Sequence, residues 1–122
     1  MATPDSGPAR EPARRPEDLG RFFVERANAG DVDGLVALYE PGAVLALPDG
    51  GAATGSDEIR QVYQRLLANR PRFEPIGQRP PLRVGGIALT STRLAGGATA
   101  EVARQQPDGS WLWVVDQPDV LG

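Results

Sequence analysis

The chain has 122 residues and a formal net charge of −3, because 16 acidic side chains outnumber 13 basic ones. All the basic residues are arginine, and the sequence contains no lysine, histidine or cysteine. These absences exclude serine–histidine and cysteine–histidine nucleophiles, lysine Schiff bases, disulfides and the usual zinc sites. Acid–base chemistry therefore falls to carboxylates, tyrosines or water, and we expect neither a metal nor a cofactor.

The length is that of one domain. The slight acidity argues against a nucleic-acid partner, since phosphate binding needs a basic surface. No apolar run approaches the roughly 18 residues of a membrane span, and the N-terminus lacks the apolar core of a signal peptide. We therefore expect a cytoplasmic protein without a membrane partner. Abundant Arg, Ala, Gly and Pro without Lys is typical of a GC-rich bacterial genome.

The first fifteen residues contain three prolines and little that could be buried. This composition predicts a flexible tail over residues 1–15, followed by a single domain over 16–122. Pro16 suits the first turn of a helix, which ends at Gly30. The apolar residues of this helix recur at helical spacing; they are Leu19, Phe22, Phe23 and Ala27.

Asp31 is expected to cap a second, short helix. Its apolar face comprises Val32, Leu35, Val36 and Tyr39. After the break at Pro41-Gly42, residues 43–47 form an apolar run that predicts a strand, and residues 52–54 return as a second short strand. A third helix begins at Ser56 and stops before Pro71. Its apolar stripe comprises Ile59, Val62, Tyr63, Leu66 and Leu67.

The second half of the chain predicts sheet. Residues 72–84 form a proline-interrupted edge strand or bulge, and better strands cover 87–94, 99–105 and 111–116. The turns between the last three contain Gly96-Gly97 and Pro107-Asp108-Gly109, both hairpin signals. The predicted fold class is therefore α+β, with a curved, mainly antiparallel sheet covered by three helices from the N-terminal half.

The run from Asn28 to Tyr39 (NAGDVDGLVALY) and the Asp108-Gly109-Ser110-Trp111 turn before the last strand carry a resemblance. In this order of elements the chain resembles the nuclear transport factor 2-like superfamily, and most of all its SnoaL-like and ketosteroid-isomerase-like bacterial branch. The resemblance implies a cone-shaped fold with an internal apolar pocket, and often a homodimer formed through the sheet. Family chemistries include steroid isomerisation, polyketide cyclisation and epoxide hydrolysis.

The sequence departs from the ketosteroid isomerase pattern at two working positions. In those enzymes the general base is an Asp that stands just before a Pro, on the strand after the second helix. Here Leu47 stands before Pro48. The tyrosine of their oxyanion hole would fall at Phe23, which has no hydroxyl. The resemblance therefore does not imply proton shuttling by that set of residues.

Two carboxylates in the last hairpin offer another acid–base pair. If Asp108-Gly109 is a two-residue turn, Glu101 lies opposite Asp116, and a four-residue loop makes them diagonal neighbours. Only an odd-residue loop or a bulge would separate them. Their face also contains Thr90, Thr92, Leu94, Thr99, Ala103, Leu112 and Val114. The opposite face is expected to contain Ala100, Val102, Trp111, Trp113 and Val115.

Two acids that close together on a semi-apolar face cannot both ionise easily, so one should hold a proton near neutral pH. Such a pair performs acid–base catalysis without histidine. Two structural alternatives stay open: the face meets solvent, or Arg83 or Arg93 neutralises the acids.

Two functions follow. The first is a pocket protein that binds a small hydrophobic metabolite, polyketide-like or steroid-like, as a homodimer. Its pocket would be lined by Phe23, Tyr39, Leu47, Tyr63, Phe73 and Trp113. The alternative is an enzyme of the isomerase, cyclase or epoxide hydrolase kind, with Glu101 and Asp116 as catalytic residues. Aromatic residues at these spacings are also typical of a simple core.

Overall fold

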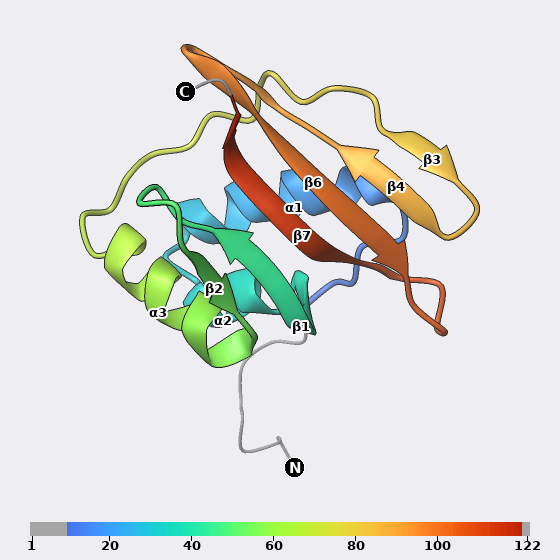
Figure 1. Ribbon diagram of the computed structural model, residues 1–122, viewed down its shortest axis with the longest axis horizontal. Helices are drawn as coiled ribbons and strands as arrows, with labels where there is room; N and C mark the ends of the chain where they lie inside the picture. The colour runs from blue at the N-terminus through green and yellow to red at the C-terminus, as the bar shows by residue number, and fades with distance from the viewer. Residues whose placement is uncertain (1–9, 121–122) are drawn as a thin grey trace.

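The computed structural model describes residues 10–120, which form three helices on one face of a curved, unclosed sheet (Figure 1). The elements in chain order are α1 (Pro16–Asn28), α2 (Val32–Val36), β1 (Tyr39–Ala46), β2 (Ala52–Thr54), α3 (Ser56–Leu67), β3 (Leu82–Val84), β4 (Ile87–Thr90), β5 (Arg93–Leu94), β6 (Gly97–Gln105) and β7 (Trp111–Val120). The predicted α+β class is confirmed.

The strand order in the sheet is β2-β1-β7-β6-β4-β3, with β5 paired to β6. All pairs are antiparallel except β1 and β7, which run parallel. Helix α1 passes behind β6 and β7 in Figure 1, and α3 lies beside β1 and β2. The mainly antiparallel sheet covered by three helices therefore agrees with the prediction.

Strand β1 differs from its predicted range because it begins at Tyr39, four residues before the expected start. Tyr39 was expected on the apolar face of the second helix, but that helix ends at Val36. The strand continues through Pro41-Gly42, and its register against β7 shifts between Tyr39 and Val44. A bulge thus accommodates the proline, which cannot donate a ladder hydrogen bond.

The predicted edge strand over 72–84 is mostly loop, since only its last three residues form β3. The segment before β3 pairs with residues 91–93 at one bridge, between Gln78 and Thr92. Two backbone hydrogen bonds flank it: Arg93 N–H donates to Gly77 O at 2.7 Å, and Arg79 N–H donates to Ser91 O at 2.9 Å. The predicted strand over 87–94 divides into β4 and β5. Three prolines before residue 82 explain why pairing is sparse there.

Residues 10–15, which the sequence assigned to a flexible tail, pack against the domain. Ala13 is only 3% exposed, and its carbonyl oxygen accepts a hydrogen bond from Trp111 N–H at 2.9 Å. Arg10 forms an ion pair of 2.7 Å with Asp31. The packed structure therefore begins before Pro16, and the remainder of the predicted tail, residues 1–9, lies outside the described residues.

The core lies between the helices and the inner face of the sheet. Its most enclosed large side chains, with less than 2% exposure, come from four different elements; they are Leu19, Leu35, Ile59 and Trp111. Packing between α1 and β7 therefore holds in place the part of the sheet that contains Glu101 and Asp116. None of the described helices is long and apolar enough to cross a membrane.

Asn28, at the end of α1, holds the loop that follows α3. Its Nδ2 donates to Phe73 O at 3.0 Å, and its Oδ1 accepts from Phe73 N–H at 2.8 Å. Asn28→Ala leaves both half-buried backbone groups without this partner, so we expect the free energy of unfolding to fall by about 1–3 kcal/mol in urea titrations. The control Asn69→Ala, at an exposed position after α3, should change it by less than about 0.5 kcal/mol. Equal losses in the two variants would contradict the role of Asn28.

Candidate functional site: a buried acid pair

Glu101 on β6 and Asp116 on β7 are directly paired across the two strands. We call these two residues the acid pair. They are 7% and 6% exposed, which is rare for acidic side chains without a cationic partner. Paired residues of adjacent strands point to the same face, so both carboxylates enter the space beneath the helices. The proximity predicted from the sequence is therefore present, while the catalytic role stays a prediction.

The pairing arises by a different route from the one expected. Near the turn Gln105 pairs with Trp111, which leaves a five-residue loop over 106–110. Such an odd loop alone would separate the acids onto opposite faces. The register then shifts by one residue, because Ala103 pairs with Trp113 but Val102 pairs with Val115. The unpaired residue between Trp113 and Val115 is a β-bulge in β7, and it returns Asp116 to the position opposite Glu101.

This bulge also corrects the predicted faces of the hairpin. Trp111 and Trp113 were expected opposite the acids, but both lie on the same inner face and are 1% and 4% exposed. Val115, in contrast, is 46% exposed on the outer face. The predicted alternation failed because it assumed an uninterrupted strand from 111 to 116.

Asp116 is the end of a chain of hydroxyl groups. Tyr39 Oη, at the start of β1, donates to Asp116 Oδ2 at 2.5 Å. Tyr39 Oη also lies 2.6 Å from Tyr63 Oη of α3. Among the described residues, only Trp111 Nε1 is a fully enclosed side-chain polar atom without a partner. Asp116 Oδ1 accepts no hydrogen bond within that part of the chain.

Glu101 has its own hydroxyl partner. Thr90 Oγ1 on β4 donates to Glu101 Oε1 at 2.6 Å, and Trp113 Nε1 donates to the same Thr90 oxygen at 3.1 Å. All three side chains are more than nine-tenths buried. Each acid thus has one carboxylate oxygen that accepts a hydrogen bond from a hydroxyl group and a second oxygen that accepts none from the described side chains.

The surroundings favour a proton on the acid pair near neutral pH. Burial, and secondly the charge of Glu101, raises the pKa of Asp116 to about 7, against the lowering effect of the Tyr39 hydrogen bond. Burial also raises the pKa of Glu101, while the hydrogen bond from Thr90 and the nearby Thr99 hydroxyl oppose the rise. Burial is thus a larger cause of the pKa shift of Asp116 than the mutual repulsion expected from the sequence.

Both structural alternatives for the acids fail. The acid pair does not meet bulk solvent, and within residues 10–120 no ion pair includes either acid. The guanidinium of Arg83 lies 4.8 Å above the Trp111 ring instead. Arg93 is exposed on β5.

Five of the six predicted pocket residues form one aromatic cluster, which comprises Phe23, Tyr39, Tyr63, Phe73 and Trp113. The ring of Phe23 meets Phe73, Tyr63 and Trp113 edge-on, with centroid distances of 5.4, 6.0 and 6.3 Å. The sixth, Leu47, is half-buried just beyond β1 and packs on the core without joining these ring contacts. Thr90 was placed on the acid face, but its hydrogen bond to Glu101 was missed.

Two hollows border α1. The first, of about 170 Å³, lies between α1 and the loop before β3; it is lined by Gly20, Arg21, Val24, Glu74, Pro75, Ile76, Gln78 and Thr92. The second, of about 140 Å³, adjoins Arg10, Arg26 and Trp111. Neither is lined by the acid pair or the aromatic cluster. Thr92, in the lining of the first, accepts a hydrogen bond from Thr99 N–H and donates one to Thr99 Oγ1.

The described architecture is that of a small α+β domain with a curved sheet, three covering helices and a buried polar group on the inner sheet face. The SnoaL-like domain family matches residues 20–117, so the chain belongs to that family. The resemblance seen in the sequence is thereby confirmed.

Solved structures share this fold at low sequence identity. A putative calcium/calmodulin-dependent protein kinase type II association domain from Thiobacillus denitrificans is 16% identical, with a TM-score of 0.73, over 93% of this chain and 100% of that chain. A ketosteroid isomerase-like protein from Erwinia carotovora atroseptica is 21% identical, with a TM-score of 0.65, over 82% and 88%. An NTF-2 like protein of unknown function from Shewanella oneidensis is 18% identical, with a TM-score of 0.65, over 81% and 91%. No protein of curated function matches the chain significantly.

The raised pKa of Asp116 predicts how stability depends on pH. The folded state binds this proton more tightly than the unfolded chain, in which the pKa of Asp is near 4. The contribution of Asp116 to the free energy of unfolding is therefore fully present below pH 4 and is lost as the pH rises towards 7. We expect the loss to reach at most about 4 kcal/mol. Asp116→Asn should remove most of this dependence, since its side-chain oxygen still accepts from Tyr39. Urea unfolding at pH 4 to 8 measures both, and an equally steep decline in the variant would contradict the assignment.

Proposed function

We propose that the chain is a small acid–base enzyme that acts on an apolar substrate through a carbonyl or epoxide oxygen. The observation that carries this proposal is the acid pair itself. Two buried carboxylates face each other, no cation neutralises them within the described residues, and each has an oxygen outside its hydroxyl hydrogen bond. Burial of charge without compensation is costly and is typical of functional sites.

The pair supplies both halves of a proton transfer. With a carbonyl substrate, Glu101 takes the proton from the carbon next to the carbonyl, and Asp116 gives its proton to the carbonyl oxygen, which yields the enol. Return of a proton to carbon and of the hydroxyl proton to Asp116 completes the exchange or isomerisation. With an epoxide, Asp116 protonates the ring oxygen as it leaves carbon, while Glu101 takes a proton from the attacking water.

The hollows beside α1 are not lined by the acid pair, so their volumes do not define the size of the substrate. The first test therefore uses small probes that contain one ring and the reacting oxygen.

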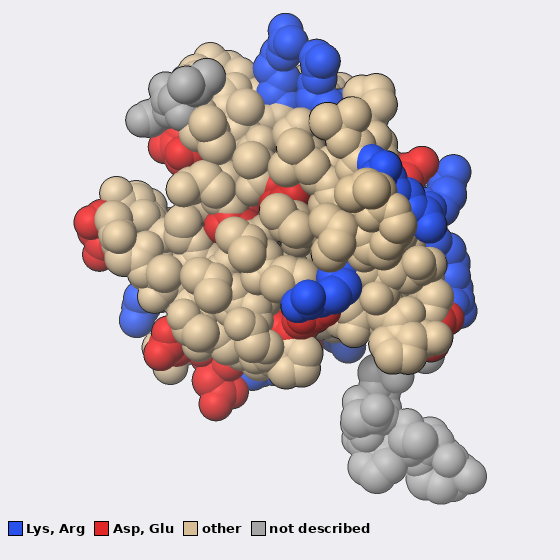
Figure 2. Space-filling model, turned by 45° about the vertical axis from the view of Figure 1, so that its right-hand side comes forward, with Lys and Arg blue, Asp and Glu red and all other residues tan. Residues whose placement is uncertain are grey.

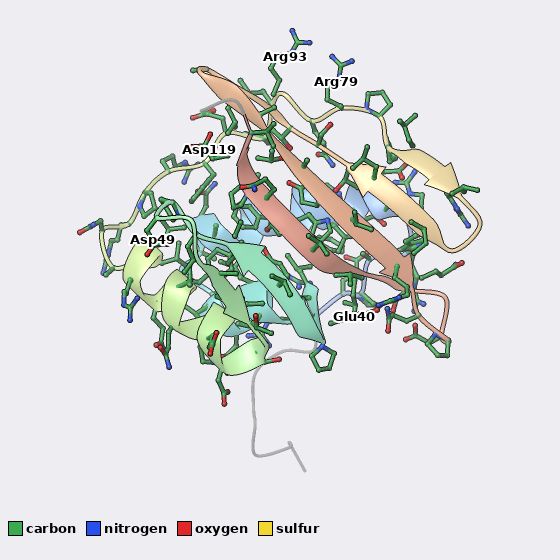
Figure 3. All side chains as sticks on the ribbon, in the orientation of Figure 1. Glu40, Asp49, Arg79, Arg93 and Asp119 are labelled. Atoms are coloured by element: carbon green, nitrogen blue, oxygen red, sulfur yellow. The ribbon has the colours of Figure 1, made fainter. Side chains whose placement is uncertain are left out.

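Cyclohexanone and cyclohexene oxide are suitable probes for the two reactions. In deuterium oxide near pH 7, we expect the protein to accelerate exchange of the ketone's α-protons or opening of the epoxide, both measured by NMR. Glu101→Gln and Asp116→Asn should each lower that rate by about 100-fold or more, because each removes one proton carrier. The control Asp119→Asn alters an exposed position near the end of the same strand and should have no effect (Figure 3). A rate that survives either acid variant would contradict the proposal.

A second candidate is a protein that binds an apolar molecule without converting it. It is favoured by the aromatic cluster, whose hydroxyl and indole groups already have partners inside the protein. Quenching of tryptophan fluorescence by cyclohexanone, saturable but without α-proton exchange, would support this candidate and contradict the enzyme.

We further propose that two copies associate through the outer face of the sheet. One continuous row crosses five strands on this face; it comprises Leu82, Leu89, Val102, Val115 and Val44. Its leucines are 70% and 45% exposed. Figure 2 shows that uncharged side chains cover most of this side of the molecule, with a few acidic and basic side chains among them.

A second copy suits this face because a twofold axis in its plane sets the apolar row against the same row of the partner. The charges at the ends of the sheet add little, since Glu40, which lies away from Arg79 and Arg93 (Figure 3), already forms an ion pair of 2.9 Å with Arg104.

Sedimentation equilibrium tests this association. We expect a dimer at micromolar concentration, and we expect Leu89→Glu to shift the equilibrium to monomer, because a buried charge would lack a partner. The matched control Leu66→Glu places the same charge on α3 at a leucine of similar exposure, 41%, and should remain dimeric. A wild-type protein that sediments as a 13.0 kDa species would contradict the dimer.

A further inference from the structure

Thr90 lies between Trp113 and Glu101 and is 5% exposed. A threonine hydroxyl has one proton to donate and two lone pairs that accept. Trp113 Nε1 donates to Thr90 Oγ1 at 3.1 Å, and an indole N–H cannot act as an acceptor. Trp113 thus occupies one lone pair of Thr90, and the Thr90 hydroxyl donates its proton to Glu101 Oε1 at 2.6 Å.

A donor with a fixed direction favours the ionised form of its acceptor, because hydrogen bonds to charged oxygens are the stronger ones. The hydrogen bond from Thr90 thus favours the ionised form of Glu101. The titratable groups that face it are Asp116 on β7 and Tyr63 on α3, and both are neutral when Asp116 holds the proton of the pair. No arginine forms an ion pair with Glu101 in the described part of the chain.

Asp116 has a donor whose direction can reverse. Either Tyr39 or Tyr63 can supply the proton in the 2.6 Å contact between their hydroxyls. Tyr39 can therefore donate to an ionised Asp116 and accept from Tyr63, or accept from a protonated Asp116 and donate to Tyr63. This arrangement stabilises Asp116 in both protonation states, as a group that gives up and regains a proton requires.

We infer that Thr90, oriented by Trp113, is a positioning residue that makes Glu101 the base and Asp116 the acid of the pair. The inference rests on the proposed function, since it assigns the two roles within that reaction. It also changes the role of Trp113, which was predicted to line a binding pocket. Its indole nitrogen instead donates to Thr90 and so orients the hydrogen bond from Thr90 to Glu101.

The variants Thr90→Val and Thr90→Ser separate the hydroxyl group from the shape of the side chain. Side-chain carboxyl carbons and the Trp113 indole resonance are followed by NMR as pH is varied. In the wild type Glu101 should ionise before Asp116. Thr90→Val should raise the pKa of Glu101 and shift the indole N–H resonance upfield, and Thr90→Ser should retain the wild-type values of both. The control Thr54→Val, at an exposed position on β2, should change neither.

Kinetics provides a second readout with cyclohexanone as the probe. Thr90→Val should lower kcat for α-proton exchange about tenfold with KM nearly unchanged, and should move the acidic limb of the pH profile upward. Thr90→Ser should restore both. A wild type in which Asp116 ionises first, a Thr90→Val variant with unchanged Glu101 titration, or a serine variant that behaves like valine would each overturn the inference. Because the titrations need no turnover, they decide it even if the exchange reaction is absent and the proposed function fails.

Discussion

The one-residue bulge in β7 is the constraint on which the site depends. The five-residue loop of the last hairpin sets Trp113 opposite Ala103, and the bulge then sets Asp116 opposite Glu101. A regular strand would place residues 113 and 116 on opposite faces, because side chains alternate along it. With the bulge, both the tryptophan that orients Thr90 and the acid that faces Glu101 enter the same interior. Bulges beside functional sites commonly re-aim side chains in this way.

The helices bury the acid pair, and this burial raises the pKa values of both acids. Packing of α1 against β7 excludes bulk water, and α3 places Tyr63 beside Tyr39. The resulting desolvation, more than the repulsion between the acids, keeps a proton on Asp116. Hydroxyl groups then distinguish the two acids, which would otherwise compete for one proton on equal terms. Stability at neutral pH is reduced as a consequence, which is typical of sites retained for chemistry and not for packing.

Local patterns predicted most of the fold. Helix α1 was fixed by Pro16 and its apolar spacing, and the hairpin turns were fixed by glycine-containing dipeptides. The pairing of Glu101 with Asp116 was also predictable, although two deviations had to cancel for it to hold. The position of the bulge was not, since no residue near Val114 signals an extra unpaired position. Likewise the reach of β1 back to Tyr39 depends on tertiary pairing with β7, which overrides the Pro41-Gly42 signal.

The central claim is that the folded protein holds one proton on the acid pair near neutral pH that the unfolded chain releases. Proton release on unfolding at pH 5.5 measures this directly, by calorimetry in buffers of different ionisation enthalpy. Carboxylates whose pKa values are lowered, such as Asp18 and Asp31, are ionised in both states at that pH and do not contribute. We expect release of close to one proton per chain, and its loss in Asp116→Asn. Unfolding without proton release would contradict it.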